Sequence, residues 1–64
     1  MIFLTTGENI RKFRTELKLT QKELGKAIGT TQQMIAQYEN GQRNPKIETL
    51  NKIAKALHTT IEEL

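Results

Sequence analysis

Residues 20–41, T-Q-K-E-L-G-K-A-I-G-T-T-Q-Q-M-I-A-Q-Y-E-N-G, constrain the fold more than any other part of this chain. Apolar residues recur at helical spacing on both sides of Gly29, which predicts two short helices joined by a tight turn at that glycine. The second helix begins with three polar side chains, Thr31, Gln32 and Gln33. The rest of the chain must therefore pack around a pair of short, closely joined helices.

Two helices joined in this way make specific steric demands. The fifth residue of the unit must be small because the helices touch there, and it is Gly25. The ninth residue favours glycine because the turn needs a positive φ, and it is Gly29. Apolar residues are needed at the fourth, eighth, fifteenth and eighteenth places, which hold Leu24, Ile28, Ile35 and Tyr38. All six demands are met, and together they predict a helix-turn-helix.

The ends of these two helices also carry recognisable signals. Thr20 followed three residues later by Glu23 predicts a capping box at the start of the first helix. Thr31 is the expected N-cap of the second helix, which should run to about Glu39. Residues 42–46, Q-R-N-P-K, predict a basic loop, because proline disfavours a helical residue before it.

The flanking segments predict three further helices and no strand. One covers residues 7–18 with Thr6 as its N-cap, and one covers residues 47–57. A short fifth helix should begin at Thr60, which forms a capping-box pattern with Glu63. The expected inward faces carry Ile10, Phe13 and Leu17 in the first helix, and Ile47, Leu50, Ile53, Ala54 and Leu57 in the fourth. The expected fold is all-α, with five short helices.

Size and composition exclude several classes of protein. A chain of 64 residues is one small domain, which we expect to comprise residues 7–64 after an N-terminal arm of residues 1–6. The absence of cysteine excludes disulfides and cysteine-ligated metal, and His58 alone cannot build a metal site, so no cofactor is expected. The net charge of +3 is compatible with a nucleic-acid partner.

The apolar tip Met1–Leu4 is far too short for a signal-peptide core or a membrane span. We therefore expect a soluble, cytoplasmic protein without a membrane partner. The tip is either a strand that docks on a partner or a disordered end. The chain ends inside the periodic segment Ile61–Leu64, from which we expect a longer parent protein or a trimmed chain.

Over residues 7–64 the chain resembles the Cro and phage-repressor type of helix-turn-helix domain, also called Xre-like. The run Gly29-Thr30-Thr31-Gln32-Gln33 is especially similar to the recognition helix of a lambdoid phage repressor. The resemblance also rests on Ile10, Arg14, Leu19-Thr20-Gln21-Lys22-Glu23-Leu24, Ile35, Tyr38-Glu39-Asn40-Gly41, Pro45, Leu50, Ile53-Ala54 and Leu57. The resemblance implies a lambda-repressor-like fold that binds double-stranded DNA.

The resemblance also implies roles for polar residues. Gln32 and Gln33 look like a base-reading pair, and Gln37 looks like a third reader one turn on. A glutamine amide offers a donor and an acceptor that match N6 and N7 of adenine, so three glutamines without arginine favour sites that contain A·T pairs. The alternative is that these glutamines are solvated residues of an exposed helix.

Contacts to the DNA backbone are implied for residues around the recognition helix. Gln21 looks like a phosphate clamp, and Thr31 is a cap that also touches a phosphate. Arg43 and Lys46 resemble backbone or minor-groove contacts; the alternative for both is ordinary surface charge. Arg14 and Glu39 lie on the inner sides of their helices, and the resemblance implies a structural ion pair between them.

Three positions depart from the family pattern. Gly25 replaces the usual alanine, His58 stands where the fourth helix often ends in glycine, and Lys46 replaces a serine or threonine cap. We expect these departures to affect local stability and not function.

The leading hypothesis is a sequence-specific transcriptional regulator, a repressor, that binds an inverted repeat as a weak homodimer. The expected dimer surface includes His58, Thr59, Ile61 and Leu64, although Ile61 and Leu64 could instead cap the monomer core. The alternative is an antitoxin or adaptor module that uses the same fold to bind a protein partner. An enzyme is disfavoured, because the chain has no cysteine nucleophile, no phosphate loop and no evident partner for its histidine. No small-molecule substrate is expected.

Overall fold

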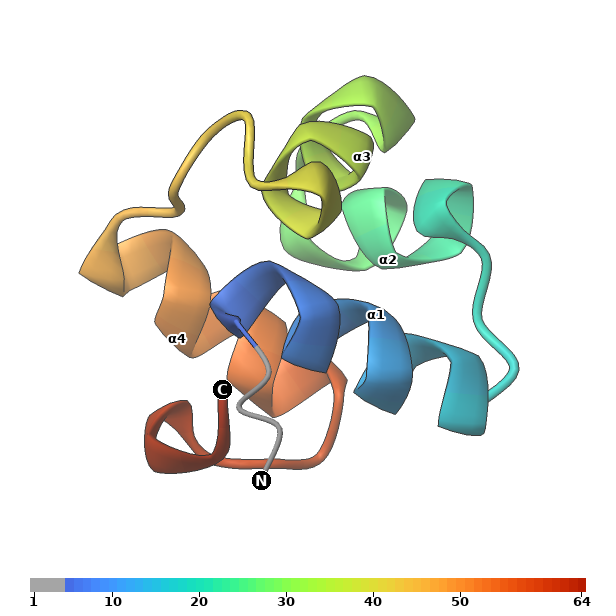
Figure 1. The fold of residues 1–64 in the computed structure, drawn as a ribbon. Helices are drawn as coiled ribbons and strands as arrows, with labels where there is room; N and C mark the ends of the chain where they lie inside the picture. Colours follow the sequence, from blue (N-terminus) through green and yellow to red (C-terminus); the bar gives the residue numbers. More distant parts are fainter. Residues whose placement is uncertain (1–4) are drawn as a thin grey trace.

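The computed structural model describes residues 5–64 as four α-helices followed by one short turn of 3-10 helix (Figure 1). The elements are α1 (Thr6–Glu16), α2 (Gln21–Ile28), α3 (Gln32–Asn40), α4 (Ile47–Ala56) and the 3-10 turn η1 (Ile61–Glu63). No strand occurs within residues 5–64. The predicted all-α fold is confirmed, except that the fifth helix is a 3-10 turn of three residues. The tip Met1–Leu4 lies outside the described residues.

A single hydrophobic core joins the helices. Helix α2 packs against both α3 and α4, α1 packs against α3, and η1 packs against α4. The buried apolar side chains are Ile10, Leu24, Ile35, Tyr38, Ile53, Ala54, Leu57 and Leu64. Figure 1 shows α3 and the C-terminal turn at opposite ends of the molecule, with α1 and α4 between them. The two ends of the domain are therefore formed by different elements, α3 at one and η1 at the other.

The N-cap of α1 is Thr5 and not Thr6, which corrects the prediction. The hydroxyl of Thr5 accepts the N–H of Glu8 at 3.2 Å, and the Glu8 carboxylate accepts the N–H of Thr5 at 3.1 Å. The two members of a capping box lie three positions apart, and Thr5 has that spacing from Glu8 whereas Thr6 does not. The predicted capping box between Thr20 and Glu23 is confirmed, with both of its bonds present.

Two apolar residues predicted to face the core are exposed instead. Leu17 is 41% exposed because α1 ends at Glu16, so Leu17 lies beyond the last helical turn. Ile47 is 65% exposed at the first residue of α4, whose buried residues Ile53 and Ala54 lie in the second half of the helix.

The predicted capping box at Thr60 is also wrong. Thr60 makes no side-chain capping bond, and the Glu63 carboxylate instead accepts the hydroxyl of Thr59 at 3.3 Å. The segment is only one 3-10 turn long, and the Glu63 N–H bonds the Thr60 carbonyl oxygen in place of the hydroxyl.

Candidate nucleic-acid interface

The turn between α2 and α3 fixes the direction in which α3 leaves. Gly29 adopts the left-handed conformation, with φ 78° and ψ 30°, as the sequence predicts. The N–H of Thr30 then bonds the carbonyl oxygen of Gly25 at 2.7 Å. A Cβ atom added to Gly25 would lie 3.0 Å from the carbonyl group of Thr31. The two helices therefore touch at the small residue that the unit requires.

The N-terminal end of α3 presents polar side chains to solvent. Thr31 is the N-cap, and its hydroxyl accepts the N–H of Met34 at 3.1 Å. Gln32 and Gln33 follow in the first turn, and both are exposed. Their side-chain amides have no hydrogen-bond partner within residues 5–64. Each amide is therefore available to a molecule outside the domain.

The remaining residues of the expected interface lie at the far end of α3 and in the loop after it. Gln37 is half-buried, and its backbone carbonyl oxygen accepts the N–H groups of Gln42 at 3.0 Å and Arg43 at 3.3 Å. Arg43 is exposed in this loop. Lys46 is exposed as the N-cap of α4 and makes no side-chain capping bond, because its ammonium group cannot accept a backbone N–H.

A hydrogen-bonded network lies beneath the C-terminal end of α3. The side chain of Glu39 is only 2% exposed, and its carboxylate forms an ion pair with Arg14 of α1. Nε of Arg14 donates to Oε2 at 2.6 Å, and its Nη2 donates to Oε1 at 3.1 Å. Nη1 of Arg14 donates to the carbonyl oxygen of Leu19 at 2.7 Å, which closes the turn before α2. No buried side-chain polar atom of the described residues lacks a partner.

Gln21, the expected phosphate clamp, also belongs to this network. It is half-buried at the first position of α2, and its Nε2 donates to Oε1 of Glu39 at 3.0 Å. Sequence reasoning did not foresee this bond, because 18 residues separate the two positions.

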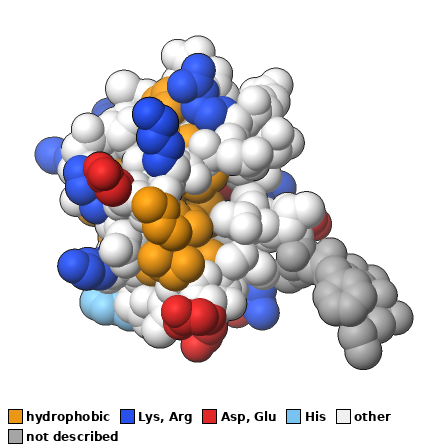
Figure 2. Space-filling model, turned by 90° about the vertical axis from the view of Figure 1, so that its left-hand side faces the viewer, with side chains coloured by type: hydrophobic (Ala, Val, Ile, Leu, Met, Phe, Trp, Pro, Cys, Tyr) orange, Lys and Arg blue, Asp and Glu red, His pale blue; other side chains and the backbone are white. Residues whose placement is uncertain are grey.

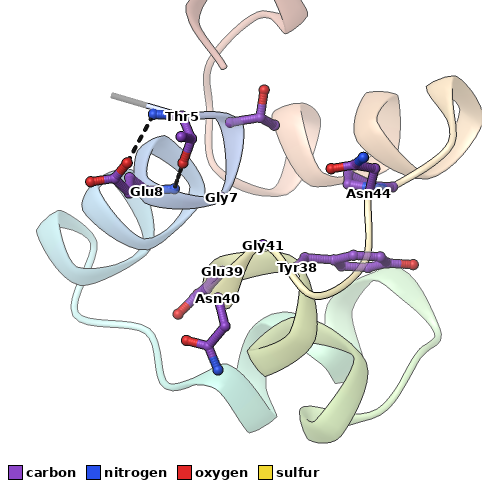
Figure 3. A pocket seen from close by; sticks show the side chains of 10 residues that line it. Thr5, Gly7, Glu8, Tyr38, Glu39, Asn40, Gly41 and Asn44 are labelled. Carbon is purple, nitrogen blue, oxygen red and sulfur yellow. Dashed lines mark hydrogen bonds between the residues drawn. The ribbon is translucent and has the colours of Figure 1, made fainter. Parts of the chain in front are cut away.

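Helix α1 crosses the end of α3 at Gly7, a residue that sequence reasoning overlooked. A Cβ atom added to Gly7 would lie 2.3 Å from the carbonyl oxygen of Tyr38 and 2.9 Å from that of Glu39. Figure 3 shows the start of α1 facing this end of α3, across a pocket of about 450 Å³. The only available sequence signal was a glycine in the first turn of a helix, where glycine is otherwise unfavourable.

The two capping glutamates carry the pKa shifts that the structure resolves. The backbone N–H of Thr5 lowers the pKa of the Glu8 carboxyl, and the backbone N–H of Thr20 lowers the pKa of the Glu23 carboxyl. In both cases the hydroxyl of the same threonine lowers the pKa further. Both carboxylates are exposed and stay ionised at neutral pH, at helix ends that favour negative charge.

Residues 5–64 contain neither a metal-binding cluster nor a membrane-spanning helix. No group of three histidine, cysteine, aspartate or glutamate side chains is placed to hold a metal ion there. The longest helix in that range has 11 residues, whereas about 20 apolar residues are needed to cross a bilayer.

An apolar area lies away from α3, on the face that carries the start of α4 and the C-terminal turn (Figure 2). Ile47 is the most exposed large apolar side chain of the described residues, and Leu50, one turn further along α4, is half-buried. Ile61 of η1 is half-buried as well. Leu64 instead packs into the core, and its backbone oxygen accepts the side-chain amide of Asn9 at 3.1 Å. Of the two alternatives for Leu64, the structure therefore places it in the monomer core.

Comparison with known proteins places this arrangement among characterised folds. A family model described as helix-turn-helix matches residues 10–64. An HTH-type transcriptional regulator of Archaeoglobus fulgidus is 38% identical over 55 residues, which cover 86% of this chain and 79% of that protein. The P22 c2 repressor in complex with a synthetic operator is 35% identical with a TM-score of 0.89, over 94% of this chain and 91% of that one.

The same fold also occurs inside an enzyme chain. The hydroxypropylphosphonic acid epoxidase from S. wedmorenis matches with a TM-score of 0.83 and 28% identity, over 89% of this chain but only 30% of that one.

The helix-turn-helix family model covers nearly all of the segment from α1 to η1. Within that segment, the present chain has Gly29 at the turn, Thr31 as the N-cap of α3 and exposed glutamines in the first turn of α3, as expected. The chain therefore belongs to the helix-turn-helix family, of the Cro and phage-repressor type.

Proposed function

We propose that this chain is a sequence-specific double-stranded DNA-binding regulator of transcription that acts as a repressor. The observation that supports this proposal most directly is the exposed start of α3. There the side-chain amides of Gln32 and Gln33 have no hydrogen-bond partner within residues 5–64, although the backbone of both residues is held in the helix. Residues 7–64 would form the DNA-binding domain, after an arm of residues 1–6. Its relatives by sequence include HTH-type transcriptional regulators, and a repressor–operator complex shares its fold.

In this proposal α3 enters the major groove of B-DNA with its N-terminal turn foremost. Gln32 and Gln33 read base edges, and Gln37 contributes a third contact one turn on. Adenine offers the matching donor and acceptor, so we expect A·T pairs in the site. Phosphate contacts by Thr31, Gln21, Arg43 and Lys46 would fix the register of α3 without reading the sequence.

The proposed active form is a weak homodimer on an inverted repeat. The exposed Ile47 and the half-buried Ile61 give an apolar surface to the side face that carries the start of α4 and the C-terminal turn (Figure 2), and His58 and Thr59 precede η1. On an inverted repeat, the recognition helices of two copies paired through this side would enter successive major grooves about 34 Å apart, one turn of DNA. DNA would strengthen the pair by mass action, because it binds both subunits together.

Two other functions use the same fold. An antitoxin or adaptor would bind a protein partner tightly without DNA. An enzyme is disfavoured as a proposal: the epoxidase carries this fold in about a third of its chain, and the present chain lacks a cysteine nucleophile and a phosphate loop. The relatives named as regulators favour the DNA-binding function.

A binding selection from randomised duplexes, at moderate salt with competitor DNA, tests the proposal. We expect an enriched inverted repeat with A·T pairs in each half-site. The variant Gln33→Ala should lose the preference at one position of the half-site, whereas Gln42→Ala, an exposed glutamine outside α3, should select the wild-type motif. Salt-sensitive binding without any motif would reduce the contact to generic phosphate attraction and would contradict the proposal.

A further inference from the structure

The bond between Gln21 and Glu39 fixes which way the Gln21 amide faces. A carboxylate oxygen only accepts hydrogen bonds, so the NH₂ group of Gln21 must point toward Oε1 of Glu39, at 3.0 Å. The amide oxygen must then point elsewhere. The carboxylate itself cannot rotate to release the amide, because its two oxygens are held by Nε and Nη2 of Arg14.

The amide nitrogen of Gln21 carries two N–H groups, and Glu39 occupies one of them. Gln21 is the first residue of α2, where the backbone N–H groups of Gln21 and Lys22 have no partner within the described residues, whereas the N–H of Glu23 bonds the Thr20 hydroxyl. A phosphate that approaches this end of α2 can thus meet the free backbone N–H groups and the second side-chain N–H together. Without Glu39 the amide could turn over and present its oxygen to the phosphate, which would repel it.

We propose that Glu39 is a positioning residue for DNA binding, which acts through Gln21 by fixing the amide so that its second N–H serves the phosphate backbone. This inference rests on the proposed DNA-binding function. The Arg14–Glu39 pair then has two effects: it joins α1 to α3, and it prepares the start of α2 for a backbone contact. The second effect concerns affinity for every DNA sequence alike, because phosphates carry no sequence information.

A double-mutant cycle on DNA affinity tests the coupling. Gln21→Ala should weaken binding to a selected operator about tenfold per half-site, and Glu39→Gln should weaken it by a similar factor. The double variant should bind about as tightly as the weaker single variant. Gln21→Ala removes the phosphate contact, and Glu39→Gln leaves a single accepting oxygen for which Arg14 and Gln21 compete, so the Gln21 amide is no longer fixed. All proteins are compared at a temperature at which circular dichroism shows each of them folded.

A second cycle supplies the control. Gln42→Ala is the same chemical change at an exposed glutamine without a bond to Glu39. The factor by which Gln42→Ala changes DNA affinity should simply multiply with the factor for Glu39→Gln in the double variant. If Gln21→Ala and Glu39→Gln weaken DNA binding by factors that multiply in the double variant, the positioning role is overturned, even if the wild type binds DNA. Failure of the wild type to bind any duplex would instead overturn the proposed function.

NMR of the wild-type protein keeps the inference testable if Glu39→Gln does not fold. The two Nε2 protons of Gln21 should give well-separated resonances in the free protein, with one shifted downfield by the carboxylate, and the side chain should be ordered. Shifts and mobility equal to those of the exposed Gln42 amide would overturn the inference.

Discussion

The two ends of α3 use polar side chains in opposite ways. At the C-terminal end, Glu39 is almost fully buried, and both its oxygens are occupied by Arg14 and Gln21. At the N-terminal end, Gln32 and Gln33 are exposed, and their amides are free within the described part of the chain. One helix therefore carries a polar group that holds the domain together and polar groups that are available to a partner.

This difference separates stability from recognition along one short helix. A buried charge that loses its partner destabilises the fold, because its desolvation is no longer compensated. An exposed amide that is removed leaves the fold almost unchanged, because water had solvated it. Substitutions at the two ends should therefore affect different measurements, and the following predictions rank these effects from the largest to the smallest.

Glu39→Ala should have the largest effect. It leaves Arg14 buried without its counter-charge, which should lower the free energy of unfolding by about 3–5 kcal/mol. For a domain of this size that corresponds to a fall in Tm of more than about 10 °C. Thermal melts followed by circular dichroism measure it, with Glu62→Ala at an exposed position as the matched control. An unchanged midpoint for Glu39→Ala would refute the structural importance of the pair.

Gly7→Ala should have the second-largest effect on stability, and it tests the close contact between α1 and the backbone at the C-terminal end of α3. The new Cβ would lie 2.3 Å from the Tyr38 carbonyl oxygen, so α1 must shift, at a cost of about 1–3 kcal/mol in unfolding free energy. Gly25→Ala is the matched comparison, since its Cβ would lie 3.0 Å from Thr31 and its helix preference improves by about 0.5–1 kcal/mol. Urea unfolding should show a clear loss for the first and a near-neutral result for the second. Equal effects would contradict the close crossing at Gly7.

Gln33→Ala should show the reverse pattern at the other end of α3. Its unfolding free energy should stay within about 0.5 kcal/mol of the wild type. Its binding to a selected operator should weaken by about 1–3 kcal/mol, measured by fluorescence anisotropy. A loss of stability without a loss of affinity would break the comparison between the two ends.

The smallest effect concerns pH and the capping boxes. The folded state lowers the pKa of Glu8 and Glu23 below 4.5, the ordinary value for the group, so the unfolded state binds more protons near that pH. The stability from these bonds is therefore present above about pH 4.5 and is lost as the pH falls through the lower, folded pKa. Melts between about pH 6 and pH 3 should show this loss. The loss should be smaller for Glu23→Gln, whose side chain can still accept the Thr20 N–H without titrating. An identical pH profile for this variant would contradict the link to Glu23.

Much of the fold and part of the candidate site could be predicted from the sequence. Gly29, the capping box at Thr20 and the N-cap at Thr31 all lie where the sequence predicts them. Gln33 is exposed because it lies opposite the buried Ile35 on the same helix, and Gln32 is exposed because it is the first residue of that helix. These features depend on residues within about one helical turn of each other, whose geometry the helix itself dictates.

Other features were decided only when the helices packed. The close approach at Gly7, the inward turn of Gln21 and the exposure of Ile47 depend on where α1, α2 and α4 meet α3 and the core. The sequence by itself determined the four α-helices, the caps of α2 and α3 and the polar start of α3, because propensity, capping and periodicity act locally. Only the tertiary structure decided which polar groups are saturated and which remain free, because that depends on distances between residues far apart in the chain.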